Sequence, residues 1–219
     1  LAVVFPWLLR TTWAAKPLPS GRLRDQLVQL AQRSGVKLAQ ILLWPTGGRI
    51  VNAAVTGTFA SSRFVFLSDG LVEQLAPSEV ECVFAHELAH VHGRHVFWRI
   101  VWIMLPMPLI GATCGPPSTH GGLETIAPSQ VWLLAGLALT LAYVMFGFSW
   151  FCRRLEHAAD LAAVQLLAQT ESPEQAMQRY AATLRQLDAG APARLAAWVR
   201  LHPSLEQRVA FLQSRAANV

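Results

Sequence analysis

Charge is scarce in this sequence. Asp, Glu, Lys and Arg together make up 14% of its 219 residues, whereas ordinary soluble domains contain about 25%. Hydrophobic residues make up 53%, so the deficit of charge indicates a surface that partly contacts lipid. The net charge of +5 does not point to nucleic acid, because no cluster of Lys and Arg is interleaved with aromatic residues in a recognisable nucleic-acid-binding module. We therefore expect a lipid bilayer, and no nucleic acid, among the partners.

Cysteine is equally scarce, and the three that are present are too few and too scattered for a disulfide framework. Cys82 and Cys152 fall on predicted helices, where small buried thiols are expected. The first residues also lack the basic leading segment of a signal peptide. We interpret residues 1–19 as the end of a preceding apolar span and a linker, and residues 20–219 as a single domain.

The pentapeptide from His86 to His90, His-Glu-Leu-Ala-His, is the most informative feature that is present. A capping box at Ser78 and Glu81 predicts that it lies on a helix, with both histidines on one face and Glu87 bordering that face. Two imidazoles at this spacing bind one Zn²⁺ at about 2.0–2.1 Å each, and the adjacent carboxylate accepts a proton from the bound water. The alternative is two surface histidines beside a glutamate on an ordinary amphipathic helix.

A catalytic zinc needs a third protein ligand. Glu156 is a candidate, because Asp160 follows it by one helical turn and suits a carboxylate that fixes the tautomer of a ligand histidine. His157 is a rival ligand, although it points about 100° away from Glu156 around the helix. The alternative is a solvated helix face with two acids and two arginines.

Two apolar stretches separate these motifs. Residues 131–150 carry no charge and are long enough to cross a hydrocarbon core of about 30 Å. Residues 96–113 are shorter and contain Arg99 near one end, which we expect to snorkel to the membrane interface. The stretches predict a hairpin of two transmembrane helices, with the buried core helices of a soluble protein as the alternative.

The charges around these stretches predict an orientation. Residues 114–130, between the stretches, contain no Lys or Arg. Basic residues instead flank the opposite ends: Arg94, Arg99, Arg153 and Arg154. The positive-inside rule therefore places the His-Glu-Leu-Ala-His motif on the cytoplasmic side. At 1.5 Å per helical residue, a hairpin also leaves both His90 and Glu156 about 9 Å from the same apolar boundary, so the two can meet.

A small sheet is predicted ahead of the metal motif. An amphipathic helix at residues 20–34 is followed by three strand-like stretches that are separated by Gly- and Pro-containing turns. These stretches are residues 38–44, 49–55 and 63–67.

With these motifs the sequence resembles the membrane-embedded gluzincin metallopeptidases, a group that includes the CAAX prenyl proteases and the HtpX-like heat-shock proteases. The resemblance rests on the His-Glu-Leu-Ala-His motif and Glu156-x-x-x-Asp160, with weaker support from three pieces: Val51-Asn52-Ala53-Ala54, Leu67-Ser68-Asp69-Gly70-Leu71 and His202-Pro203-Ser204. It implies an α+β, mainly helical fold with a zincin-like core. In that core, a small sheet lies beside the motif helix and the transmembrane hairpin is inserted between the ligand motifs.

The resemblance also implies roles for individual residues. One Zn²⁺ per chain would be held by His86, His90 and Glu156, with Glu87 as the general base. Further roles concern the peptide: Asn52 and Ala53 would lie on a strand that binds substrate, and His202 and Arg208 would stabilise the oxyanion. The alternatives are a turn residue at Asn52, a loop histidine and a surface arginine.

We expect a zinc-dependent endopeptidase that hydrolyses peptide bonds of membrane-associated or misfolded proteins or peptides. A polypeptide substrate is therefore the expected partner besides the bilayer. The main alternative is a non-catalytic zinc-binding membrane scaffold or quality-control module. A zinc hydrolase that acts on a lipid-linked, non-peptide substrate is a third possibility.

Overall fold

The structure is a computed structural model that describes residues 4–108, 111, 129–189 and 203–216. The chain divides into two compact units. The first consists of Leu1–Gly93, His157–Ala193 and Ser204–Val219, and the second of Arg94–Glu156 and Arg194–Pro203. The division runs through a continuous helix, α8 (Ser149–Leu167), which begins in the second unit and ends in the first.

The first unit contains a four-stranded mixed sheet in the order β1-β2-β4-β3. Its strands are β1 (Lys16–Pro17), β2 (Gln40–Trp44), β3 (Ala53–Thr56) and β4 (Phe64–Ser68). β2 pairs in parallel with β4, whereas β1 and β3 pair antiparallel with their neighbours. The three predicted strands are present with shifted ends, and β3 forms one edge of the sheet.

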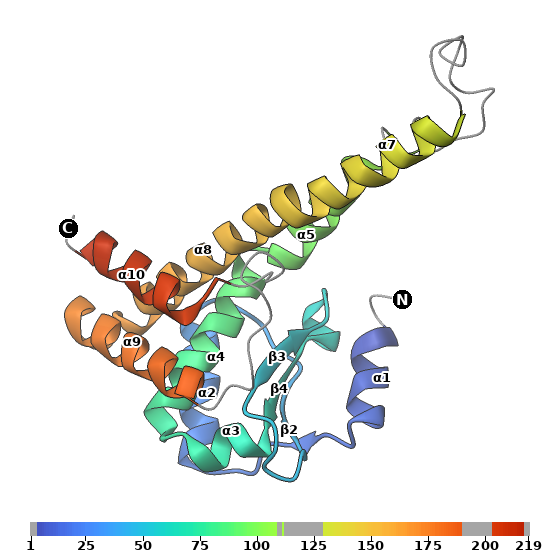
Figure 1. Cartoon of the computed structure of the whole chain (residues 1–219). Helices are drawn as coiled ribbons and strands as arrows, with labels where there is room; N and C mark the ends of the chain where they lie inside the picture. Colours follow the sequence, from blue (N-terminus) through green and yellow to red (C-terminus); the bar gives the residue numbers. More distant parts are fainter. Residues whose placement is uncertain (1–3, 109–110, 112–128, 190–202, 217–219) are drawn as a thin grey trace. The chain divides into compact units, whose positions relative to one another are not determined.

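Alternation along β4 gives the sheet two apolar faces. Phe64 and Phe66 belong to a small cluster with the end of α1 (Val4–Thr12), whereas Val65 and Leu67 belong to the main core. That core also contains Leu27 and Leu30 of α2 (Arg22–Arg33). The helix α4 (Pro77–His92) contributes Val80, Phe84 and Leu88. Figure 1 shows α1 and α4 on opposite sides of the sheet.

The helix α4 carries the His-Glu-Leu-Ala-His motif and packs against α2, β3 and α9 (Pro173–Ala189). It follows a short helix, α3 (Asp69–Gln74). The prediction that Ser78 and Glu81 cap this helix is wrong, because α4 already begins at Pro77. The Glu79 carboxylate instead accepts a hydrogen bond of 2.7 Å from the backbone N–H of Ala76. A carboxylate in the first turn also favours the helix through its dipole.

The C-terminal helices of the first unit begin with similar caps. Ser172 precedes α9, and its hydroxyl accepts a hydrogen bond of 3.2 Å from the backbone N–H of Gln175. Ser204 makes the same contact, also 3.2 Å, with Gln207 at the start of α10 (Leu205–Ala216). α10 packs against α9.

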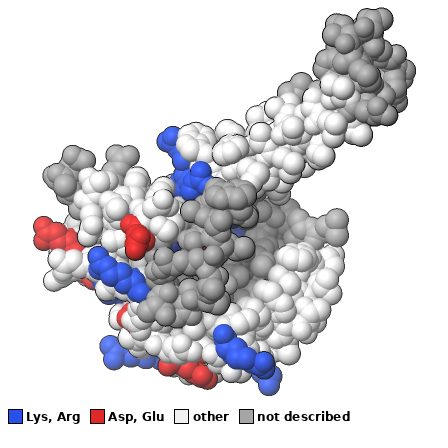
Figure 2. All heavy atoms as spheres, viewed as in Figure 1, with Lys and Arg blue, Asp and Glu red and all other residues white. Residues whose placement is uncertain are grey.

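The second unit contains α5 (His95–Met104), α7 (Ser129–Ala142), the π-helical segment η4 (Tyr143–Phe148) and the beginning of α8. Residues Leu133–Leu167 form one helix that is long and apolar enough to cross a membrane, and only 11% of its most apolar window is buried. This exposure disfavours a buried core helix. The face drawn in Figure 2 carries no acidic or basic side chain along α7.

The predicted hairpin of two membrane helices is not shown. Among the described residues one helix is long enough to span a bilayer, whereas α5 has 10 residues and a span needs about 20. Much of residues 96–130 lies outside the described part of the chain. That Arg99 snorkels to an interface stays a prediction; in the structure its guanidinium forms an ion pair with Glu156.

Candidate metal centre

The two histidines of α4 face each other across one helical turn. Their Nε2 atoms lie 3.1 Å apart, and the rings are nearly perpendicular, with an interplanar angle of 89°. Two nitrogen ligands of a tetrahedral zinc ion, each about 2.1 Å from the metal, lie about 3.4 Å apart. The spacing of His86 Nε2 and His90 Nε2 therefore fits a shared metal ion.

Asp160 lies beside His86. Its side chain is fully buried on α8, and Oδ1 lies 3.1 Å from His86 Nδ1. A proton on Nδ1 satisfies this carboxylate and leaves the Nε2 lone pair available to a metal. The contact is compatible with the role predicted for Asp160, which stays a prediction.

Arg208, on α10, neutralises Asp160. Its Nε donates a hydrogen bond of 2.8 Å to Asp160 Oδ2, and its Nη2 donates to Oδ1. A bidentate pair of this kind combines charge with a fixed geometry. These contacts give Arg208 a positioning role on Asp160, while its predicted action on an oxyanion stays a prediction.

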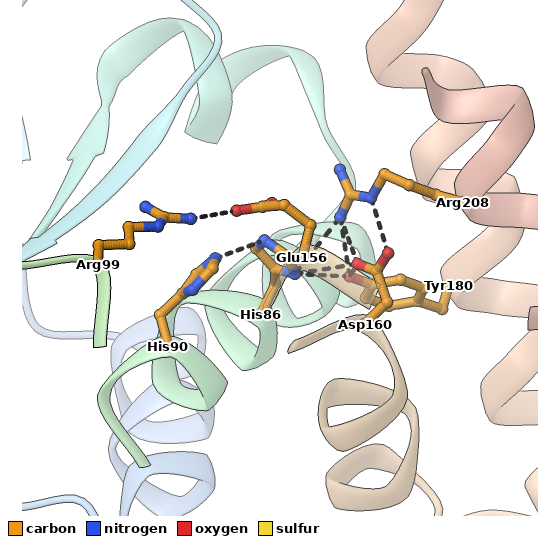
Figure 3. A network of polar contacts seen from close by, with 7 residues as sticks. All are labelled: His86, His90, Arg99, Glu156, Asp160, Tyr180 and Arg208. Atoms are coloured by element: carbon orange, nitrogen blue, oxygen red, sulfur yellow. Dashed lines mark hydrogen bonds and ion pairs between the residues drawn. The ribbon is translucent and has the colours of Figure 1, made fainter. Parts of the chain in front are cut away.

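Tyr180, on α9, completes the group around Asp160 (Figure 3). Its hydroxyl donates a hydrogen bond of 2.8 Å to Asp160 Oδ1 and lies 3.0 Å from His86 Nδ1. Burial, together with the negative charge of Asp160, raises the pKa of Tyr180 well above its ordinary value. Tyr180 therefore stays protonated and remains a donor over the working pH range.

Glu156 precedes Asp160 by one turn on the same continuous helix, so helix geometry places both carboxylates on one face. Glu156 is 1% exposed. It joins His86 and His90 in a group that offers three ligand atoms, all within 4.8 Å of one another. This is the one such group found among the described residues, and two imidazoles plus one carboxylate form a donor set that suits zinc.

The other predicted site residues are placed as follows. Glu87 is half-buried on α4. The rival ligand His157 packs its ring against Phe211, with the ring centroids 4.3 Å apart, and is not in the metal-binding group. Ala53 opens β3, and Asn52 lies just before it. His202 lies outside the described residues.

The sequence interpretation missed the contacts of Tyr180 and Arg99. Tyr180 is 94 residues from His86 and lies in an ordinary helical stretch, so no local signal marks it. Arg99 did carry a signal, because it is the one residue among Asp, Glu, Lys and Arg within α5. A lone charge in an apolar helix indicates a specific partner.

Comparisons with known proteins agree with this architecture. The model of Peptidase family M48 matches residues 17–216. A Protease HtpX homolog from Janthinobacterium sp. (strain Marseille) is 28% identical over 213 residues, which cover 87% of this chain and 70% of the relative. Protease HtpX from Acinetobacter baylyi is 25% identical over 238 residues, which cover 94% of this chain and 78% of the relative.

The fold also resembles a solved structure. The crystal structure of S. mikatae Ste24p matches with a TM-score of 0.72 and 20% sequence identity. The match covers 96% of this chain and 54% of the Ste24p chain, so this chain spans about half the length of that protein. The similarity supports the mainly helical fold with a small mixed sheet.

Proposed function

Because the chain belongs to peptidase family M48, we propose that it is a zinc-dependent endopeptidase that works at a membrane. The observation that carries this proposal is the group of His86, His90 and Glu156, with its three ligand atoms within 4.8 Å of one another. The buried carboxylate of Asp160 beside His86 supports it further. Three protein ligands leave one coordination position open, as a catalytic site requires and a closed structural site does not.

Glu87 is the proposed general base. A zinc ion bound at this site would supply Lewis acidity for the scissile carbonyl and a water of lowered pKa. Glu87 accepts the proton of the attacking water and passes it to the nitrogen of the leaving amine. Asp160 holds His86 in the tautomer that presents Nε2. His202 and Arg208 stay candidates for stabilising the oxyanion.

The edge strand β3 is the proposed binding site for the peptide. An edge strand offers unpaired backbone groups to an extended segment, which is the basis of strand addition. β3 also packs against α4, which carries Glu87. At its beginning, Asn52 Oδ1 accepts a hydrogen bond of 2.9 Å from the backbone N–H of Ala53, which fixes this end of the strand. The proposed substrates are membrane-associated or misfolded polypeptides.

Metal analysis combined with digestion of casein tests the proposed function. We expect one zinc per wild-type chain, and we expect a chelator to stop cleavage until zinc is added back. His86→Ala, His90→Ala and Glu156→Gln should each lower both zinc content and cleavage. The control is His92→Ala, because His92 lies on the same helix but is exposed. Zinc without cleavage would favour a scaffold, and cleavage that survives removal of all zinc would refute the proposal.

We further propose that the site lies on the cytoplasmic side of the membrane and that two apolar helices form a hairpin. The arginines that flank the apolar stretches support this orientation. A membrane-impermeant maleimide should label Glu73→Cys only in inverted vesicles, because Glu73 is exposed in the first unit. Cys114, between the two stretches, should be labelled from the other side, whereas Cys82 and Cys152 are buried. Labelling of both positions from one side would contradict the hairpin.

A further inference from the structure

Arg99 and Glu156 form an ion pair inside the second unit. Nη2 of Arg99 donates a hydrogen bond of 2.6 Å to Oε1 of Glu156. The carboxylate is 1% exposed and the arginine 30%. Arg99 is the one residue among Asp, Glu, Lys and Arg within α5, and a cation on such an apolar helix is unfavourable unless it has a function or a partner. Its described partner is a predicted metal ligand (Figure 3).

Aromatic contacts hold α5 against the helix that carries Glu156. Trp102, one turn after Arg99, stacks on Phe151 with ring centroids 4.4 Å apart and an interplanar angle of 16°. The hydroxyl of Tyr143 donates a hydrogen bond to the backbone carbonyl of Trp102. Both contacts involve Trp102, so they hold α5 in place one turn from the ion pair.

A carboxylate has two oxygens and can accept a hydrogen bond on one while it binds a metal through the other. Carboxylates that ligate metals are commonly held by such a donor, and loss of the donor weakens metal affinity. Arg99 donates to Oε1 of Glu156, and Glu156 offers one carboxylate oxygen to the group of three ligand atoms. We propose that Arg99 is the positioning residue that orients Glu156 as a zinc ligand. This inference rests on the proposed function, because it assumes that Glu156 binds zinc.

The test measures zinc affinity rather than activity. The full chain in detergent is titrated with zinc against a competing fluorescent chelator, for the wild type, Arg99→Met and Arg99→Lys. We expect the Kd of Arg99→Met to rise about 10–100-fold, as for other residues that orient metal ligands. Arg99→Lys should restore part of the affinity, because lysine keeps the charge but lacks the planar fork of arginine.

A matched control removes a different arginine from the same unit. Arg154 is exposed and lies over the ring of Trp150, 5.2 Å from its centroid. Arg154→Met removes the same charge and adds the same side chain as Arg99→Met, but it leaves the Glu156 carboxylate untouched. We expect its zinc affinity to stay within about twofold of the wild type, a change of roughly 0.4 kcal/mol.

A double variant tests whether Arg99 acts through Glu156. In a Glu156→Gln background, Arg99→Met should weaken zinc binding no further, because the ligand that Arg99 orients is gone.

An unchanged Kd in Arg99→Met would overturn the inference. The ion pair would then have only a structural role, visible as a lower thermal midpoint of the metal-free Arg99→Met chain. A tighter Kd would overturn it as well, because the guanidinium would then compete with the metal. If Arg99→Met does not fold, Arg99→Gln carries the same expectation. A wild type that binds no zinc would instead refute the proposed function.

Discussion

Glu87→Gln is expected to reduce peptide hydrolysis by about 10²–10⁴-fold, the usual contribution of a general base. The amide is nearly isosteric with the carboxylate but does not accept a proton from water at neutral pH. Glu87 is not in the group of three predicted ligands, so zinc content and zinc affinity should stay unchanged. The measurement is kcat/KM on a peptide substrate together with metal analysis of the same preparation.

A control separates the loss of the base from the loss of one negative charge. Glu73→Gln makes the same chemical change at an exposed position on α3, and we expect it to leave both activity and zinc content at wild-type values. Proteolysis that persists in a zinc-replete Glu87→Gln protein would reject Glu87 as the base. Loss of zinc in that variant would show instead that Glu87 supports the metal site.

Local spacing predicted the parts of the site that lie within one helix. His86 and His90 are one turn apart, as are Glu156 and Asp160, and both relations follow from helix geometry alone. The strands were predicted because Gly and Pro mark their ends, although their boundaries shifted. The start of α4 was misplaced because two acids, Glu79 and Glu81, lie near the beginning of the helix and either resembles a cap.

The contacts between helices could not be predicted in the same way. Arg208 reaches Asp160 from 48 residues away and Tyr180 reaches it from 20, and both contacts depend on how α8, α9 and α10 pack. Arg99 meets Glu156 across 57 residues. It is the one residue among Asp, Glu, Lys and Arg within α5, but its partner is known only from the folded arrangement of α5 and α8. Sequence thus predicted the proposed ligands better than the residues that hold them.

Asp160→Asn is expected to be the most destabilising single change near the site. The carboxylate is fully buried and accepts hydrogen bonds from Arg208 and Tyr180. In the variant, the amide nitrogen would face the donors of Arg208, and the guanidinium would lose its counter-charge. Removal of one partner from a buried ion pair destabilises a fold by about 3–5 kcal/mol. We expect a loss of this size in the free energy of unfolding of the metal-free chain.

Zinc affinity should fall as well, by about 10–100-fold, because His86 loses the anion that fixes its tautomer. A double-mutant cycle separates the two effects. In Asp160→Asn combined with Arg208→Met, the unpaired guanidinium is gone, so stability should recover in part relative to Asp160→Asn alone. Zinc affinity should not recover, because the charge beside His86 Nδ1 is still missing. If both quantities recover together, Asp160 acts on the metal site only through the stability of the fold, and its role in orienting His86 must be abandoned.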